Sequence, residues 1–288
     1  MIGSAVVREL TERGHFVIRL VRSNPNRERG DLVWDPVSGE IERSGLVNIQ
    51  AVLHLAGESI LGLWTTKKRE RMHRSRVTAT EYLAEAVAGM STPPKVFACA
   101  SAIGIYGSRG DAWLNEQSEP GSGYLAQLAR EWEGATSVLK TAGVRVVNLR
   151  IGIVLSTHGG ALASMLPPFK LGLGGPLGRG RHYMSWITLH DVVQAMVFAL
   201  ETPTLGGPVN LTAPHPLTNK AFTQTLARTL RRPAIFPIPT ALLHLLPGNM
   251  GEEVFLQSLR VEPAALTRAG FKFKHPDLEA ALSDVLSA

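Results

Sequence analysis

The sequence predicts an α/β fold: a doubly wound parallel sheet with a smaller, mainly helical domain towards the C-terminus. Three observations support this class. Through the first 155 residues, short apolar runs alternate with helical segments, which is typical of a parallel sheet covered by helices on both faces. The chain has 288 residues, 44% hydrophobic and 19% charged, enough for one large domain or a domain with a smaller appendage. Beyond Leu155 the alternation gives way to glycine and proline pairs, and then to mostly helical patterning.

Each element follows from its local pattern of apolar and turn residues. The expected order is a helix over residues 2–13 ended by Gly14, a buried strand over 16–22, a short hairpin over 31–42, a buried strand over 51–57, a charged helical segment over 65–88, a strand over 96–101, a helix over 125–142 and a strand over 144–151. Residues 156–185 are expected to be rich in loops. The chain returns to the sheet through Trp186 and Ile187, a helix over 191–200 and a strand over 208–211. From residue 218 onwards the pattern is helical, with an apolar segment over 235–246 and a terminal amphipathic helix after Pro276.

Composition excludes several function classes. The formal charge of +6 and the pI near 9.7 favour anionic partners such as nucleotides. Basic residues do not alternate with aromatic ones, so no nucleic-acid partner is expected. The single cysteine, Cys99, excludes an internal disulfide framework and a cysteine-based metal site, and a cytoplasmic location is the default. No apolar stretch reaches about 18 residues and no signal-peptide pattern opens the chain, so no membrane partner is expected.

Two short signals point to a dinucleotide. A dinucleotide-binding unit needs a strand, a glycine-rich turn and a helix whose N-terminus faces the pyrophosphate. Gly3 stands where the last glycine of such a turn would be, although an ordinary helix start also explains it. Arg22 and Ser23 stand at the end of the next strand, where an NAD-binding protein carries an acidic residue for the ribose 2′-hydroxyl. Because an arginine pairs with a 2′-phosphate, NADP(H) is expected rather than NAD; the alternative is a solvated arginine at a strand end.

Motifs along the whole chain resemble one family in order and spacing. They are Ile2-Gly3, Leu55-Ala56-Gly57-Glu58, Ser75-Arg76, Ser101-Ala102-Ile103-Gly104-Ile105-Tyr106-Gly107, Trp132-Glu133, Leu149-Arg150-Ile151-Gly152, Pro168-Phe169-Lys170-Leu171-Gly172-Leu173-Gly174-Gly175-Pro176, Trp186-Ile187 and Gly270-Phe271. In these motifs the chain resembles the atypical extended short-chain dehydrogenase/reductases called epimerase-like proteins, which are similar to nucleoside-diphosphate-sugar epimerases. The resemblance implies a Rossmann-type sheet and a family-specific C-terminal domain at about residues 237–286.

The chain departs from the family pattern at its start. Relatives begin with a strand and a glycine-rich loop ahead of Ile2, and that strand is central in the doubly wound order. Its absence would leave unpaired edges on two neighbouring strands. We therefore expect a start codon assigned too far downstream, or a truncation.

The second departure concerns catalysis. The family pattern is a serine that holds the substrate oxygen, a tyrosine that moves the proton, and a lysine four residues later that lowers the tyrosine pKa. Ser101 and Tyr124 match the first two, but Leu128 occupies the lysine position. A tyrosine with a pKa near 10 needs a nearby cation to act as a base around neutrality. Arg150 is one candidate for that cation, and the charge of the nicotinamide is another.

For several other polar residues the sequence is compatible with a structural role as well as a functional one. Arg181, His182 and Tyr183 follow a glycine-rich run and form a polar, aromatic wall suited to an anionic substrate; a solvated loop is the alternative. His54 lies on a buried strand and is expected to be a satisfied core residue. The basic residues between 67 and 76 are expected to form a solvated helix face, with Arg76 the one that turns inward.

These observations predict an NADP(H)-binding, epimerase-like oxidoreductase acting on an unidentified carbonyl or hydroxyl substrate. The Rossmann domain would comprise residues 1–155 and about 186–212, without its first strand. The substrate-side domain would comprise 156–185 and 213–288. The predicted cofactor residues are Gly3, Arg22, Ser23, Leu55, Ala56, Gly57 and Arg150; the catalytic residues are Ser101 and Tyr124; the substrate residues are Arg181, His182 and Tyr183; no metal is expected.

Two alternative functions stay open. Leu128 favours a non-catalytic NADP(H) sensor, and a fragment that binds no dinucleotide is a third hypothesis. The oligomeric state stays open, although related folds often form homodimers through the helices matching 65–88 and 125–142.

Overall fold

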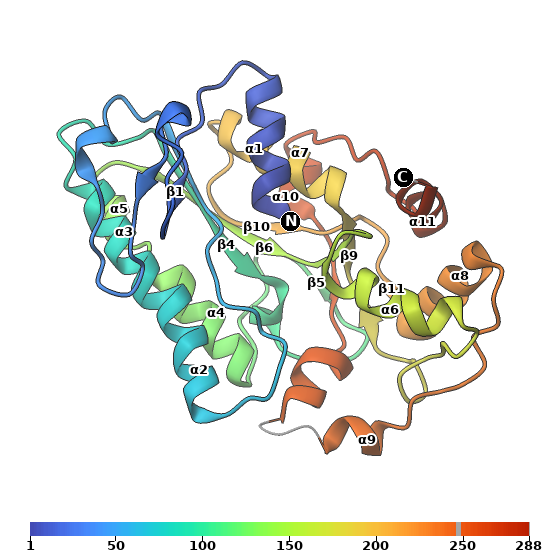
Figure 1. Ribbon diagram of the computed structural model, residues 1–288. Coiled ribbons are helices and arrows are strands. Elements are labelled where there is room, and N and C mark those ends of the chain that lie inside the picture. Colours follow the sequence, from blue (N-terminus) through green and yellow to red (C-terminus); the bar gives the residue numbers. More distant parts are fainter. Residues whose placement is uncertain (246–248, 288) are drawn as a thin grey trace.

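The computed structural model describes residues 1–245 and 249–287, and its main sheet lies between two helical layers (Figure 1). Within these residues the sheet has four strands, all parallel, in the order β10-β6-β4-β3. They are β3 (Ala51–His54), β4 (Val96–Ala102), β6 (Arg145–Ile151) and β10 (Gly207–Leu211). Since the strands share one direction, their carboxyl ends meet at one edge. The predicted α/β class with a Rossmann-type parallel sheet is confirmed.

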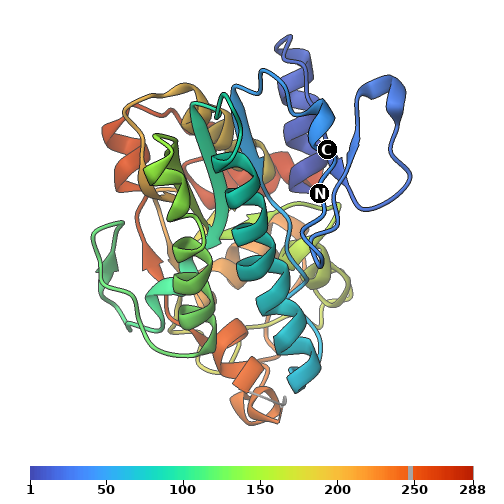
Figure 2. The same cartoon turned by 90° about the vertical axis from the view of Figure 1, so that its left-hand side faces the viewer.

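One face of the sheet is covered by helices from the first half of the chain (Figure 2). They are α2 (Thr66–His73), the π-helical turn η3 (Arg74–Thr78), α3 (Ala79–Ala88), α4 (Tyr124–Gly134) and α5 (Val138–Thr141). Phe97 on β4 is buried there in one apolar cluster with Leu83, Leu128 and Trp132. Both expected helical segments are confirmed, although the second is broken at residues 135–137.

The other face carries α1 (Ile2–Glu12), α7 (Leu189–Glu201) and α10 (Ala264–Arg268). Val6 of α1 and Met196 of α7 are buried in the core on this side. The first helix ends as predicted, because Gly14 takes a left-handed backbone with φ of +83° that a glycine adopts without strain.

Each of β3 and β1 has one edge without a partner in the described part of the chain. There β3 hydrogen-bonds to β4 alone, and β1 (Leu20–Val21) pairs only with β2 (Leu32–Val33), in a separate parallel sheet. The prediction of a buried strand over 16–22 was wrong in its extent, since only two residues are strand and the Phe16 side chain is 80% exposed. A strand paired on one side only has few backbone hydrogen bonds to hold a longer run extended.

A third apolar cluster lies beside the sheet, on α6 (Gly160–Lys170), α8 (Asn219–Leu230) and α11 (Leu278–Ser287). The prediction that residues 156–185 are mostly loop missed α6, whose interior holds Pro167 and Pro168. Leu162, Leu166 and Phe169 lie at helical spacing and are buried, and this burial offsets the hydrogen bonds that the prolines cannot donate.

The remaining elements are short. They are η1 (Arg27–Arg29), η2 (Arg43–Gly45), η4 (Ile103–Tyr106), β5 (Trp113–Leu114), β7 (Ile153–Leu155), β8 (Tyr183–Met184), β9 (Trp186–Thr188), β11 (Leu217–Thr218), α9 (Thr240–His244), η6 (Gly251–Leu256) and β12 (Arg260–Val261). The expected hairpin over 31–42 closes through an antiparallel bridge between Trp34 and Ile41. Only the strand at 207–211 rejoins the main sheet, because β9 pairs with β7 instead. Residue 246, the end of the expected apolar segment, lies outside the described residues. Among those that are described, no helix is both long and apolar enough to cross a membrane.

Candidate functional site

Five predicted site residues lie along the carboxyl edge of the main sheet. Leu55, Ala56 and Gly57 follow β3 directly, while Ser101 on β4 and Arg150 on β6 are register partners. In open parallel sheets, ligands bind at this edge, where loops leave the strands. The fold therefore gathers these residues from three separate stretches of sequence.

Hydrogen bonds connect β4, α4 and β6 beneath the edge. Ser101 Oγ donates to Glu133 Oε1 at 2.7 Å. Arg150 holds the same carboxylate with two bonds, Nε to Oε1 at 2.8 Å and Nη2 to Oε2 at 2.9 Å. Its Nη1 also donates to Tyr106 Oη at 2.9 Å, and Tyr106 donates to Asn210 Oδ1 at 2.7 Å. We call these five residues the edge network. A buried polar network with its bonds made rigidifies the elements that carry it.

The charge of Arg150 is neutralised inside the edge network. Burial by itself would lower the pKa of Arg150, but the hydrogen bonds and negative charge of Glu133 outweigh burial and raise that pKa. Burial also raises the pKa of Tyr106, against the opposing effect of Arg150. The hypothesis that Arg150 replaces the missing lysine beside Tyr124 is corrected here, because its guanidinium is paired with Glu133.

Tyr124 is the first residue of α4 and is held at both ends. Its backbone N–H and that of Leu125 donate to the Glu253 carboxylate, at 3.0 and 2.7 Å, so a side chain of η6 caps the helix. Its hydroxyl donates to the carbonyl oxygen of Arg69 at 3.1 Å. Its ring lies edge-on to Trp64, with centroids 5.3 Å apart. The tyrosine therefore enters the site in a fixed orientation.

Two arginines lie close to this tyrosine. The Arg69 guanidinium is 4.8 Å from the centre of the Tyr124 ring. The Arg76 guanidinium lies 5.1 Å from the Trp132 ring centre and 3.4 Å from where a β-carbon on Gly57 would stand. Burial raises the pKa of Tyr124, and the charges of Arg69 and Arg76 oppose that rise. The prediction that Arg76 turns inward agrees with this geometry.

The rest of the basic segment is less solvated than expected. Lys68 is 8% exposed, and its Nζ contacts Glu58 Oε1 at 2.8 Å. Glu58 also accepts a weaker bond from Arg71 Nε at 3.4 Å, and the hydrogen bond from Lys68 lowers its pKa. The expectation of a fully solvated face was therefore wrong for Lys68, because it holds the loop that follows β3.

The remaining predicted cofactor residues lie at the surface. Arg22 and Ser23 are exposed just after β1. Gly3 lies in the first turn of α1, and no atom outside its immediate neighbourhood comes within 4 Å of a β-carbon placed there. The space beside Gly3 is thus open in the described part of the chain.

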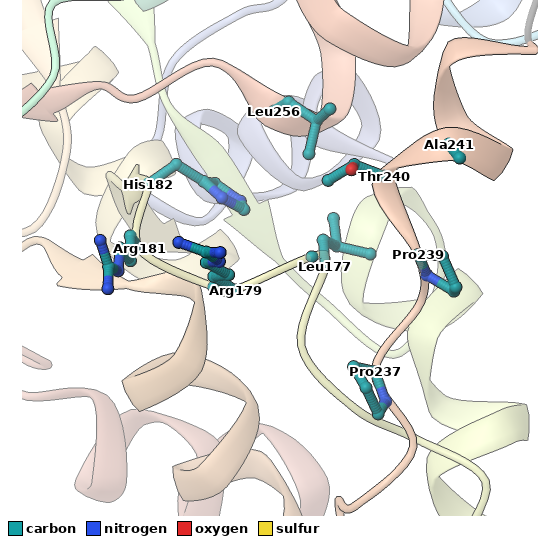
Figure 3. A pocket seen from close by; sticks show the side chains of 11 residues that line it. Leu177, Arg179, Arg181, His182, Pro237, Pro239, Thr240, Ala241 and Leu256 are labelled. Atoms are coloured by element: carbon teal, nitrogen blue, oxygen red, sulfur yellow. The ribbon is translucent and has the colours of Figure 1, made fainter.

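Two adjoining cavities lie near the predicted substrate residues, and they share Arg179, Gly180 and Arg181. Leu177, Arg179, Arg181 and His182 line one wall of the first cavity, of about 570 Å³, and Pro237, Pro239, Thr240 and Leu256 line the other (Figure 3). The second, of about 620 Å³, is lined by Asp111, Tyr183, Thr218 and Lys220 besides the shared residues. We call the two together the basic cleft. All three predicted substrate residues line it.

The glycine run explains how the cleft wall is built. A β-carbon on Gly175 would lie 2.0 Å from the Phe236 carbonyl oxygen, so only glycine lets the two segments touch. Gly178 N–H donates to Ile238 O at 2.8 Å, and Ile238 N–H donates to Pro176 O at 2.9 Å. The run is therefore ordered by backbone pairing with residues 236–238.

His182 and Tyr183 differ in their surroundings. Burial lowers the pKa of His182, and among the described residues no hydrogen-bond partner meets its Nε2. Tyr183 stacks on the guanidinium of Arg260, which lies 4.6 Å from its ring centre and 4.0 Å from that of Trp113. The cleft therefore combines exposed cations, an unpaired imidazole nitrogen and an aromatic wall.

Sequence reasoning missed several residues of the site. Glu133, Tyr106 and Asn210 complete the edge network, and Glu253 caps α4 from the C-terminal part of the chain. Glu133 had two signals, since it stands in the Trp132-Glu133 motif and is a charged neighbour of the apolar stripe of α4, but neither signal identifies its partner. Nothing in the sequence indicates that Glu253, 129 residues after Tyr124, reaches its backbone.

Fold and site together define a class: a Rossmann-type α/β protein with its ligand edge at the carboxyl ends of the strands. A model of the NAD-dependent epimerase/dehydratase family matches residues 1–211, and a model of a domain of unknown function, DUF1731, matches 238–285. The chain belongs to the NAD-dependent epimerase/dehydratase family. The resemblance to epimerase-like proteins with a family-specific C-terminal domain is confirmed.

Similar proteins match over nearly the whole chain. An epimerase family protein of Mycobacterium leprae is 40% identical over 284 residues, which are 98% of this chain and 92% of the relative. The human epimerase family protein SDR39U1 is 34% identical over 290 residues, 99% of this chain and 96% of the relative. The crystal structure of human SDR39U1 isoform 2 with NADPH has a TM-score of 0.91 at 32% identity and covers 100% of this chain and 96% of its own.

Proposed function

We propose that this chain is an NADP(H)-binding, epimerase-like oxidoreductase acting on a carbonyl or hydroxyl compound that carries an anionic group. One observation carries the proposal: arginines lie after β1 and beside the glycine turn that follows β3, where a dinucleotide phosphate would lie. Arg22 is exposed at the end of β1, where an acid would select NAD, and Arg76 flanks Gly57. Family membership and the NADPH in the structure of human SDR39U1 support it.

The residues present fit such a cofactor in three places. Arg22 and Ser23 would hold the 2′-phosphate, since a guanidinium pairs well with phosphate oxygens. Leu55, Ala56 and Gly57 would lie beside the cofactor, with Arg150 near its nicotinamide end. The N-terminus of α1 carries no side-chain cap, and the space beside Gly3 is open, so phosphate oxygens could approach its free backbone N–H groups.

When bound, NADP(H) would supply or accept a hydride at its nicotinamide ring. Tyr124 would transfer the proton between its hydroxyl and the substrate oxygen once its hydrogen bond to the Arg69 carbonyl is exchanged for one to the substrate. Ser101 would hold that oxygen, but its only proton is donated to Glu133, so it must exchange this bond first. The basic cleft would bind the anionic part of the substrate through Arg179, Arg181 and Lys220. The substrate-side residues 156–185 and 213–288 would thus form a unit distinct from the cofactor-binding one.

A second candidate is a non-catalytic NADP(H) sensor. Leu128 supports it, because the residue at the lysine position is 3% exposed and packed in the apolar core. The hydrogen bond from Ser101 to Glu133 also supports the sensor, because it occupies the serine hydroxyl. Oxidation of bound NADPH by a panel of carbonyl compounds distinguishes the two candidates, with Tyr124→Phe as the control: no oxidation by any member supports the sensor.

Titration of NADPH and NADH into the purified chain tests the cofactor. We expect NADPH to bind more tightly than NADH, and Arg22→Glu to remove that preference. Arg43→Glu makes the same charge change at an exposed site on η2 and should leave the preference intact. A form extended upstream by a strand and glycine-rich loop is measured in parallel. Binding by neither form would contradict the dinucleotide proposal.

A further inference from the structure

Tyr124 needs a positive charge that the usual position does not supply. Proton transfer from a tyrosine leaves a phenolate, and a buried phenolate is costly unless a cation lies near it. Leu128, one turn after Tyr124, is apolar and buried. Arg150, the cation on the neighbouring strand, is held by Glu133. If the proposed oxidoreductase function holds, the charge must come from another element.

The helical segment from α2 into η3 brings two guanidinium groups to this place. The Arg69 guanidinium lies 4.8 Å from the centre of the Tyr124 ring, and the Arg69 backbone carbonyl oxygen accepts a hydrogen bond from the tyrosine hydroxyl at 3.1 Å. Arg76 extends between Gly57 and Trp132, and thus between the turn after β3 and helix α4. Arg76 therefore lies between the proposed cofactor turn and the helix that carries the tyrosine, and Arg69 lies against the tyrosine ring itself.

The sequence explains why these two arginines, and not their neighbours, face inward. Positions seven residues apart lie on nearly the same face of an α-helix, two turns apart. Arg71 and Arg74 fall on other faces and are exposed. The π-helical turn η3, Arg74–Thr78, widens the helix at Arg76, and single π-turns inside helices often mark functional sites.

We propose that Arg69 and Arg76 together replace the missing lysine, stabilising the tyrosinate form of Tyr124 while its proton is transferred. In the reductive direction, the Oη–H bond of Tyr124 breaks and the proton forms the O–H bond of the product alcohol. The hydride from bound NADPH forms the new C–H bond, so the carbonyl carbon is reduced and NADPH is oxidised to NADP⁺. Tyrosinate then takes a proton from solvent. The arginines act through Tyr124 and are positioning residues.

The charges around Tyr124 agree with this role. Burial has the largest effect on the pKa of Tyr124 and raises it; Arg69 on α2 and Arg76 on η3 lower this pKa, whereas Glu131 on α4 and Glu253 on η6 raise it further. The tyrosine therefore remains protonated and able to donate at neutral pH. Without either arginine, less positive charge would oppose burial and the two carboxylates. The pKa of Tyr124 would therefore rise further, and the phenolate would be harder to form.

The test measures the ionisation of Tyr124 directly, without cofactor or substrate. A fluorinated tyrosine at position 124, whose phenol ionises at lower pH than that of tyrosine, is titrated by ¹⁹F NMR. We expect Arg69→Met and Arg76→Met each to shift the midpoint to higher pH, and Arg76→Lys to restore most of the shift. Arg74→Met removes a charge from the exposed face of the same segment and should not move the midpoint. Circular dichroism at each pH confirms that the variants stay folded.

The outcomes separate this proposal from the proposed function. A midpoint unchanged by Arg69→Met and Arg76→Met, or moved equally by Arg74→Met, would overturn the arginine pair whether or not the chain is an enzyme. A shifted midpoint together with no oxidation of NADPH would retain the electrostatic pair and reject the oxidoreductase. Where a substrate is found, Arg76→Met should lower kcat roughly tenfold and move the pH profile, with KM little changed.

Discussion

The edge network and the basic cleft differ in how completely their polar groups are satisfied. In the network, the Arg150 guanidinium, the Glu133 carboxylate and the Ser101 and Tyr106 hydroxyls bond to one another or to Asn210, out of water. In the cleft, Arg179 and Arg181 are exposed, and Nε2 of His182 meets no partner among the described residues. Both regions are rich in charge, but in the network a ligand must first displace an internal hydrogen bond, whereas the cleft has hydrogen-bonding groups already available.

The contrast shows why charge alone is a poor guide to function. Buried ion pairs that satisfy each other hold elements in place, and their loss is felt as instability. Exposed cations on an ordered wall cost little stability and remain available to an anion. Substitutions in the network should therefore change folding, and substitutions in the cleft should change binding.

The largest effect is expected from Glu133→Gln. It leaves Arg150 buried with no opposite charge, and breaking one partner of a buried pair costs about 3–5 kcal/mol. Urea unfolding followed by circular dichroism measures the loss. Glu9→Gln removes the acid of the more exposed pair with Arg13, four residues further along the chain, and should cost little. Equal losses from the two variants would show that the edge network is no more structural than the surface.

A second effect follows from His54, which is buried on β3. Its Nε2 meets Thr80 Oγ1 at 3.0 Å, as expected for a satisfied core histidine, and burial lowers its pKa to about 4. Its pKa is lower in the folded than in the unfolded state, so stability is complete above pH 6.5 and falls as the pH drops towards 4. The full loss is about 3 kcal/mol.

The check is the unfolding free energy at several pH values for the protein and for His54→Gln. The variant should lose less stability between pH 6.5 and 4 than the parent chain does. Parallel pH dependences for the two would show that His54 does not titrate between the folded and unfolded states as burial requires.

Gly175→Ala tests whether the cleft wall is as rigid as its backbone pairing indicates. The new β-carbon would overlap the Phe236 carbonyl, and forced overpacking costs about 1–3 kcal/mol. Gly134→Ala, at a helical position with open space, should be neutral or slightly stabilising. Thermal unfolding compares them. A neutral Gly175→Ala would mean that residues 236–238 move away freely.

The sequence was sufficient for what local patterning encodes. The strands at 96–102 and 145–151 and the helices on both faces follow from apolar spacing, and the loss of the lysine at Leu128 is a single readable substitution. The elements that the sequence did not predict depend on contacts between residues far apart in the chain. The strand expected over 16–22 is reduced to the two residues of β1, because β1 has a strand partner on one side only. Helix α6 forms despite Pro167 and Pro168, because the burial of its apolar face offsets the hydrogen bonds that the prolines cannot donate.

The same limit applied to the site. The residues that leave the sheet edge could be predicted, because carboxyl ends of parallel strands converge. The partner of Arg150 could not, since Glu133 lies on a helix whose rotation about its axis is set by packing. Arg76 was expected to turn inward, but the contact between Arg69 and Tyr124 depends on how α2 crosses α4. Contacts between elements are thus the part that sequence spacing leaves undetermined.

The smallest effect on stability, and a clear one on binding, is expected from Arg181→Met. The side chain is exposed at the junction of both cavities, so unfolding free energy should change by no more than about 0.5 kcal/mol. Inorganic pyrophosphate serves as the anionic probe, and its affinity by calorimetry should fall roughly tenfold because charge-assisted hydrogen bonds are lost. Arg268→Met, at an exposed position on α10, is the matched control. If both variants weaken pyrophosphate binding equally, the attraction comes from the net charge of the protein, and the exposed cations of the cleft do not form a specific anion site.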